Sequence, residues 1–229
     1  MVVAGGVLAA SAVTARGTDL RAERAQSLKD LVLVQAGDVR QREDSVSELR
    51  AEIEQLAREF STPALRKLRA QIADARPIAG LTEQVGPGII VTLNDAPRPE
   101  GGHIDDSIDP NWLLVHQEDI QGVVNALWGG GATAISVMDQ RIINTSAIKC
   151  VGSTVLVNGK VFSPPFVIAA IGKPSDLIAS LDNDESFTYF KDIAATFGLE
   201  YSITTVSNLE VDEYTGLGAM QYAKRYNAK

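Results

Sequence analysis

The sequence is poor in several kinds of residue, and each shortage excludes a class of protein. Cys150 is the only cysteine, so an intramolecular disulfide framework and a cysteine-rich zinc site are both excluded. Aromatic residues make up 6% of the 229 residues, and 29 acidic against 21 basic side chains give a net charge of −8. Because nucleic-acid binding needs a basic surface and usually stacking rings, nucleic acid is not expected as a partner. Hydrophobic residues nevertheless make up 45% of the chain, too many for a disordered protein.

Long hydrophobic runs are also missing. Residues 2–15 carry no charge, but as a helix these fourteen residues rise about 21 Å, less than the roughly 30 Å hydrocarbon core of a bilayer. We expect residues 1–17 to be the remnant of a longer N-terminal transmembrane helix, with a disordered tail or a short buried helix as the alternatives. Arg16, Arg21 and Arg24 follow the run, and under the positive-inside rule they leave the orientation in the membrane open.

Residues 18–77 are rich in Glu, Arg, Ala, Leu and Gln, and their apolar side chains recur with the 3,4 spacing of a coiled coil. Eight of ten a and d positions are apolar, and together they form what we call the seam: Leu28, Val32, Val39, Val46, Leu49, Ile53, Leu56 and Phe60. This pattern predicts a homodimer held through the helix. Gly37 weakens the same helix by about 1 kcal/mol relative to alanine.

A break in the helix is expected near residues 61–63. Ser61 or Thr62 can cap a new helix that has Pro63 in its first turn, and this second helix ends near Pro77. Because Pro63 would also permit a reversal of the chain, a helical hairpin folded back on its own domain is the alternative to a coiled coil.

Residues 78–210 are richer in glycine and β-branched residues and read as a separate domain. Strands are expected at 88–93, 132–138, 153–157, 160–162, 166–171 and 201–206. Helices are expected at 111–128 and at 173–197, the second with an interruption around 182–185. The pair Asn158-Gly159 predicts a type I′ turn. The order of elements predicts an α+β fold, a ferredoxin-like α/β plait with an inserted β-hairpin, followed by a C-terminal tail at 211–229.

Several short strings in this domain form a set. They are Gly86-Pro-Gly-Ile-Ile-Val-Thr-Leu, Val115-His-Gln-Glu-Asp-Ile-Gln, Val124-Asn-Ala-Leu-Trp, Gly131-Ala-Thr-Ala-Ile-Ser, Gln140-Arg, Ser146-Ala-Ile-Lys-Cys-Val-Gly, Asn158-Gly and Pro164-Pro-Phe-Val-Ile-Ala-Ala-Ile-Gly. As a set, over roughly residues 80–215, they resemble the bacterial family called domain of unknown function 881.

The resemblance implies a membrane-anchored protein of Gram-positive and actinobacterial type. Such a protein has one N-terminal transmembrane helix, a coiled coil and an α/β domain outside the membrane. Some relatives lie in gene neighbourhoods of cell division and wall synthesis, so a protein of those processes is the expected partner. The family has no assigned catalytic residues, so the resemblance implies none here. The start of the membrane helix is missing from this chain, which departs from the family's plan.

No glycine-rich segment has the context of a phosphate site. Residues 86–88 and 129–131 each precede a predicted strand, whereas a phosphate-binding turn follows a strand and opens a helix. We therefore predict no cofactor.

One acidic loop contains the weak candidates for metal ligands. His103, Asp105, Asp106 and Asp109 offer one imidazole and three carboxylates, which suit a hard cation or a transition metal. Because their spacing is not that of a recognised calcium loop, a solvated loop is the simpler interpretation, and we predict no metal.

Five polar residues form the candidate interaction surface. Gln140, Arg141 and Thr145 lie between two predicted strands, in a segment that is either a contact surface or an ordinary connecting loop. His116 and Asp119 share one face of a helix and could orient a general base, but no nucleophile is tied to them by spacing. The simpler role for Asp119 is to support the helix N-terminus.

Cys150 and Trp128 are expected to be structural residues. Cys150 lies in an apolar stretch and is predicted to pack as a small hydrophobe. Trp128 continues a helical row with Val124 and Leu127, so a place in the core is expected for it.

Three functions are compatible with these sequence features. The favoured one is a non-enzymatic envelope protein, single-pass in the cell membrane with its soluble domain outside, that dimerises and binds a division or wall-synthesis protein. The second is a regulatory domain that senses a small ligand, which rests on fold analogy alone. The third is a metal-assisted hydrolase that uses His103, the nearby aspartates and His116.

Overall fold

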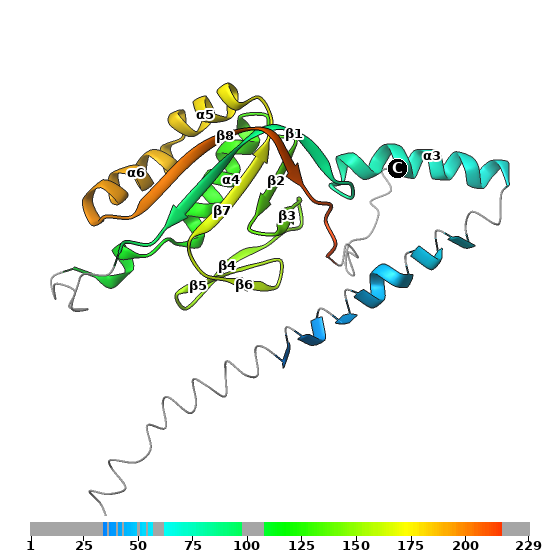
Figure 1. Cartoon of the computed structure of the whole chain (residues 1–229), viewed down its shortest axis with the longest axis horizontal. Coiled ribbons are helices and arrows are strands. Elements are labelled where there is room, and N and C mark those ends of the chain that lie inside the picture. Colours follow the sequence, from blue (N-terminus) through cyan, green and yellow to red (C-terminus); the bar gives the residue numbers. More distant parts are fainter. Residues whose placement is uncertain are drawn as a thin grey trace, which may run out of the picture. The chain divides into compact units, whose positions relative to one another are not determined.

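A computed structural model describes residues 34–56 with gaps at 36, 40, 43, 50 and 54, residues 62–97 and residues 108–216. The chain divides into two units, Met1–Gln55 and Leu56–Lys229, which we describe separately (Figure 1). The predicted membrane remnant at 1–17, the seam residues Leu28, Val32 and Phe60, and most of the tail at 211–229 lie outside the described residues. Among the helices that the structure describes, none is both long and apolar enough to cross a membrane.

The described residues of the first unit are helical, as the spacing of the seam predicts. In the second unit, helix α3 (Pro63–Ile78) begins at the expected cap. The Thr62 hydroxyl accepts a hydrogen bond of 3.2 Å from the Leu65 backbone N–H, and Pro63 occupies the first turn, where its missing N–H costs nothing. The predicted start of a helix with Thr62 as its cap and Pro63 in its first turn is therefore observed, while residues 57–61, where the preceding helix would end, lie outside the described residues. None of the α3 residues is buried, and Leu68 and Ile72 lie on its exposed surface.

The centre of the second unit is a five-stranded sheet in which all neighbouring strands are antiparallel. Its order is β3-β2-β7-β1-β8. The strands are β1 (Gln84–Asn94), β2 (Ala134–Val137), β3 (Gln140–Ile142), β7 (Phe166–Ile171) and β8 (Glu200–Val211). Four of the predicted strands, at 88–93, 132–138, 166–171 and 201–206, lie in this sheet as β1, β2, β7 and β8, and β8 is longer than predicted.

A second, three-stranded sheet has the order β4-β5-β6. Its strands are β4 (Ile148–Val151), β5 (Thr154–Val157) and β6 (Lys160–Phe162). Asn158 and Gly159 join β5 to β6 with φ values of 50° and 90°, and positive φ at both central residues is the mark of a type I′ turn. The predicted hairpin is confirmed.

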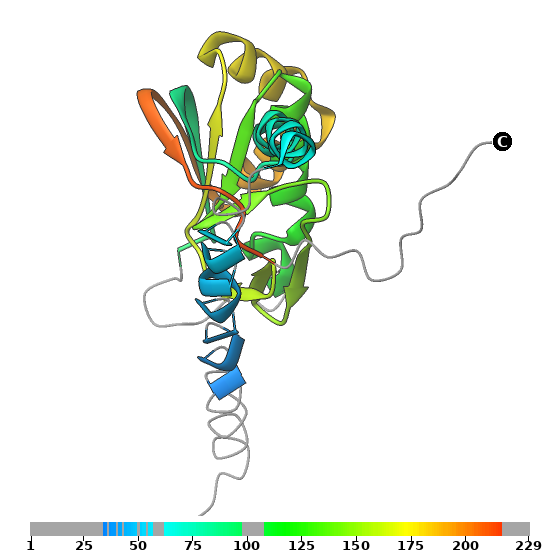
Figure 2. The same cartoon turned by 90° about the vertical axis from the view of Figure 1, so that its right-hand side faces the viewer.

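Three α-helices pack on one face of the large sheet: α4 (Gln117–Gly129), α5 (Pro174–Asn183) and α6 (Glu185–Phe197). Figure 2 shows them gathered on one side of the strands. The core between the helices and the sheet follows strand alternation, since Ile89, Val91 and Leu93 of β1 are all fully buried. A second, smaller cluster of buried side chains includes Ile171 and Leu209.

The first helix of this domain begins later than predicted. Residues 110–113 form a short 3-10 helix, η1 (Pro110–Leu113), which the Asp109 carboxylate caps by accepting from the Asn111 N–H at 2.9 Å. The chain is then extended, because the Val115 N–H donates to the Asp95 carboxylate at 2.8 Å, and α4 begins only at Gln117. The prediction of one helix over 111–128 is wrong at its start, while the broader prediction of an α+β domain with antiparallel sheets and several helices is confirmed.

Candidate functional site

Arg141 is the most unusual residue of the domain. It lies on the short strand β3 and is 4% exposed. Its Nη1 donates to three backbone carbonyl oxygens, those of Thr82 at 3.3 Å, Val211 at 3.4 Å and Asp212 at 2.9 Å. The side chain therefore ties β3 to the segment before β1 and to the end of β8.

The Nε and Nη2 atoms of this guanidinium have no hydrogen-bond partner among the residues that the structure describes. Nε is fully buried without a hydrogen bond, and within residues 62–97 and 108–216 no carboxylate forms an ion pair with Arg141. A Cβ placed on Gly80 would lie 3.6 Å from Nε and 3.8 Å from Nη2, so the backbone of Gly80 packs closely against this edge of the guanidinium. Burial lowers the pKa of Arg141, but an arginine keeps its charge in a protein. Among the residues that the structure describes, Arg141 is therefore a buried cation without a counter-charge.

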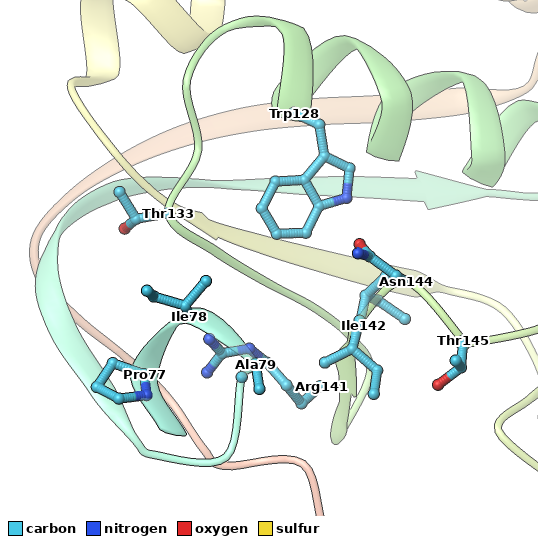
Figure 3. Close-up of a pocket in the computed structure, with 11 residues that line it drawn as sticks. Pro77, Ile78, Ala79, Trp128, Thr133, Arg141, Ile142, Asn144 and Thr145 are labelled. Carbon is cyan, nitrogen blue, oxygen red and sulfur yellow. The ribbon is translucent and has the colours of Figure 1, made fainter. Parts of the chain in front are cut away.

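A cavity of about 360 Å³ adjoins Arg141. It lies where the end of α3, the end of α4 and the β3 turn meet, and its lining includes Ile78, Trp128, Arg141, Ile142, Asn144 and Thr145. Figure 3 shows the Trp128 indole and the Asn144 amide on one side and the Arg141 guanidinium, beside Ile78, on the other. The site thus combines one cation, an amide and two apolar surfaces.

Trp128 differs from its predicted place in the core. Val124 and Leu127 of the same helix are buried as expected, but the indole is 39% exposed at the last turn of α4, where it lines the cavity. One position along a helix turns a side chain by about 100°, which carries Trp128 away from the buried row. Sequence reasoning missed this residue, and its place at the helix end was the available signal.

The predicted interaction surface is divided by the fold. Gln140 and Arg141 are buried, and the Gln140 amide donates to the Asp139 carbonyl at 3.1 Å and carboxylate at 2.8 Å. Thr145 is exposed and lines the cavity. The structure therefore places Arg141 and Thr145 at one cavity, with Arg141 acting from inside the domain.

His116 and Asp119 lie at the beginning of α4 and do not line the cavity. The His116 backbone N–H donates to Asp119 Oδ2 at 2.7 Å, while the imidazole Nδ1 lies 4.0 Å from the same oxygen. Burial raises the pKa of the Asp119 carboxyl, and the hydrogen bond from His116 opposes part of that rise. This geometry stabilises the N-terminus of α4 by satisfying an otherwise unpaired N–H group.

Of the four candidate metal ligands, the structure describes only Asp109. Asp109 caps η1, and His103, Asp105 and Asp106 lie outside the described residues. In the part of the chain that the structure describes, no group of three His, Cys, Asp or Glu side chains is placed to hold a metal ion.

Cys150 is exposed on β4, which corrects its predicted packing as a small hydrophobe. Its Sγ accepts from the Gln117 N–H at 3.1 Å, and its own N–H donates to Gln117 Oε1 at 3.1 Å. The residue thus connects β4 to the first turn of α4.

Known proteins are similar to part of this chain. UPF0749 protein YlxW from Bacillus subtilis is 42% identical over 98 residues, which cover 42% of this chain and 40% of that protein. UPF0749 protein Rv1823 from Mycobacterium tuberculosis is 28% identical over 127 residues, which cover 55% of this chain and 41% of that protein. The matched region thus spans about two fifths of the length of these relatives.

A solved structure has a similar fold. It is the crystal structure of an uncharacterized conserved protein from Mycobacterium tuberculosis, which is 24% identical with a TM-score of 0.51 over 68% of this chain and 99% of that chain. At this identity the likeness concerns the fold alone. The family described as "Bacterial protein of unknown function (DUF881)" matches residues 71–224, and the chain therefore belongs to this family.

Proposed function

We propose that this protein is a non-enzymatic interaction module of the bacterial envelope that self-associates through the seam. In this proposal an N-terminal helix anchors it in the cell membrane as a single-pass protein, and the α+β domain lies on the outer side. There the domain binds a protein of cell division or wall synthesis.

The exposed seam is the observation that carries the proposal. Four of its residues are 43% to 64% exposed in the single chain: Val39, Leu49, Ile53 and Leu56. Apolar side chains at 3,4 spacing on one helix gain free energy when a second helix buries them, at about 25 cal/mol for each Å² removed from water. A second copy of this chain supplies the matching heptads.

We also interpret the α+β domain as a ferredoxin-like plait with additions. The strands β1, β2, β7 and β8 follow one another in the chain with α4 after the first strand and α5 and α6 after the third. Their spatial order β2-β7-β1-β8, all antiparallel, supports this interpretation. In it β3 extends one edge, and β4, β5 and β6 form the inserted sheet.

The test is the oligomeric state of the full chain, measured by light scattering at micromolar concentration. The variant Leu49→Gln/Ile53→Gln/Leu56→Gln makes the seam polar while keeping good helix-forming residues. We expect the wild type to be a dimer and this variant a monomer. The matched control is Ser47→Gln/Glu48→Gln/Ala51→Gln, which changes three exposed positions outside the seam, at b, c and f of the heptad. This control should remain a dimer.

Two results would contradict the proposal. A wild-type monomer would show that the helix does not self-associate, and a dimer in the seam variant would place the contact elsewhere. The apolar run at residues 2–15 is present in all three proteins, so it cannot explain a difference between them.

The cavity beside Arg141 supports a second candidate, a regulatory domain that senses a small ligand. A concave site with a few polar groups among apolar ones is the usual form of such a site. Thermal-shift screening of metabolites and wall fragments tests it, and a screen without any stabilising compound would count against it.

A further inference from the structure

We propose that the cavity beside Arg141 binds the carboxylate or phosphate group of a small, partly apolar ligand. The proposal deepens the ligand-sensing candidate by naming the chemistry of its ligand, and it is independent of self-association through the seam.

The uncompensated charge of Arg141 is the first observation. A buried cation is costly unless an anion or hydrogen bonds offset the loss of water. The three carbonyl oxygens that Nη1 contacts supply hydrogen bonds but no negative charge. An oxyanion in the adjoining cavity would supply the missing charge.

The free edge of the guanidinium is the second observation. Nε has no partner, and Nη2 donates no hydrogen bond to the residues that the structure describes. A guanidinium binds carboxylate and phosphate through such N–H groups, and these charge-assisted hydrogen bonds are about twice as strong as neutral ones. Nη1 is occupied and holds the side chain in place, and Nε is buried, so Nη2 is the N–H group that remains available to a ligand in the cavity.

The residues that line the cavity indicate which group the ligand carries next to its anion. Ile78 is almost fully exposed, and the Trp128 indole presents an exposed aromatic surface. Asn144 is exposed, and its amide lies below the indole (Figure 3). A ligand with an apolar group next to its anion would cover the indole and Ile78 while Asn144 offers a further hydrogen bond.

The experiment uses Trp128 as the reporter. The sequence contains two tryptophans, and Trp112 stacks on Phe197 at 5.5 Å, away from the residues that line the cavity. The full-length variant Trp112→Phe therefore leaves a single indole at the site. Its fluorescence is titrated with N-acetyl-leucine and with N-acetyl-leucinamide, which differ only in carboxylate against amide.

A second arm uses butyl phosphate and butanol. We expect a saturable change with at least one anionic probe, and binding at least about tenfold tighter than that of its neutral partner. The two arms distinguish a carboxylate from a phosphate as the preferred group. Equal binding of the anionic and neutral probes in both arms, or no saturation with any of them, would overturn the proposal.

A pair of variants then tests Arg141 itself. Arg141→Met removes the cation and should abolish the preference for the anionic probe, provided that circular dichroism shows a folded protein. Lys149→Met removes an exposed charge of the same sign from β4 and should leave the preference unchanged. A folded Arg141→Met protein that keeps the preference would exclude Arg141 as the anion-binding group. If Arg141→Met does not fold, the comparison of acid and amide in the Trp112→Phe protein still decides whether the site selects anions.

Discussion

The helical region and the α+β domain place their apolar side chains differently. In the helical region Leu49 and Ile53 are more than half exposed, whereas in the domain Leu127 and Phe166 are almost completely enclosed. The domain has enough sequence-distant partners to close its own core, while a single helix has no second surface to pack against. The domain therefore encloses its own core, and the exposed side chains of the helical region are consistent with the proposed self-association through the seam.

The largest expected effect is the loss of a core ring. Phe166→Ala on β7 should lower the free energy of unfolding by about 3–5 kcal/mol, because it removes a buried ring and leaves a cavity. Tyr189→Ala on α6 removes a ring that is mostly exposed and is the matched control. Urea denaturation measures the free energy of unfolding of both variants. Similar decreases in the two variants would mean that Phe166 does not lie in the core.

The same substitution should have opposite effects in the two regions. A Cβ on Gly88 would overlap the Ala170 carbonyl oxygen of the neighbouring strand and lie 2.9 Å from the Leu209 side chain. Gly88→Ala should therefore destabilise the domain by about 1–3 kcal/mol. Gly37 is helical with nothing within 4 Å of such a Cβ, so Gly37→Ala should stabilise the helix by about 1 kcal/mol.

Two observables separate these effects. Urea denaturation followed by near-ultraviolet circular dichroism reports the domain, and the thermal loss of far-ultraviolet ellipticity at micromolar protein concentration reports the helical region. An increase in domain stability with Gly37→Ala would support the helical hairpin folded back on its own domain, and would weaken the contrast between the two regions.

Removing a helix cap should also affect the domain and α3 differently, and the expected changes are smaller. The Asp184 carboxylate accepts from the Phe187 N–H at 2.9 Å, and Thr62 caps α3 in the same way. Asp184→Ala should cost the domain about 1 kcal/mol, since it leaves that N–H without its partner. Thr62→Ala should reduce the helicity of α3 with little change in the unfolding of the domain, because no residue of α3 is buried. Equal losses of domain stability would show that α3 is part of the cooperative unit.

Local signals made much of the fold predictable. Thr62 and Pro63 mark the start of α3. Asn158 and Gly159 form the turn between β5 and β6, because they adopt positive φ values that few other residues adopt. These features depend on interactions between residues close in the sequence. For the same reason the apolar runs could be assigned to strands before any pairing was known.

The candidate site was not predictable in the same way. The three carbonyl groups that hold Arg141 come from residues 59, 70 and 71 positions away, so no local pattern shows that this arginine is buried. The sequence places Arg141 and Thr145 in one segment, but only the fold brings Trp128 and the end of α3 to the same cavity. The late start of α4 was also not predictable from local sequence, because the Val115 N–H donates to Asp95, 20 positions away.

The smallest expected effect concerns one carboxyl of the domain, Asp119. Burial raises its pKa in the folded state, so folding favours its protonated form. The stability that this group contributes is complete below the pKa of the unfolded chain, about 4, and is lost as the pH rises through the raised pKa. Asp119→Asn keeps an oxygen that can accept from the His116 N–H and does not titrate. Urea unfolding measured from pH 3 to pH 8 should therefore show the wild type losing stability relative to this variant across that window, and parallel profiles would mean that the carboxyl is not desolvated.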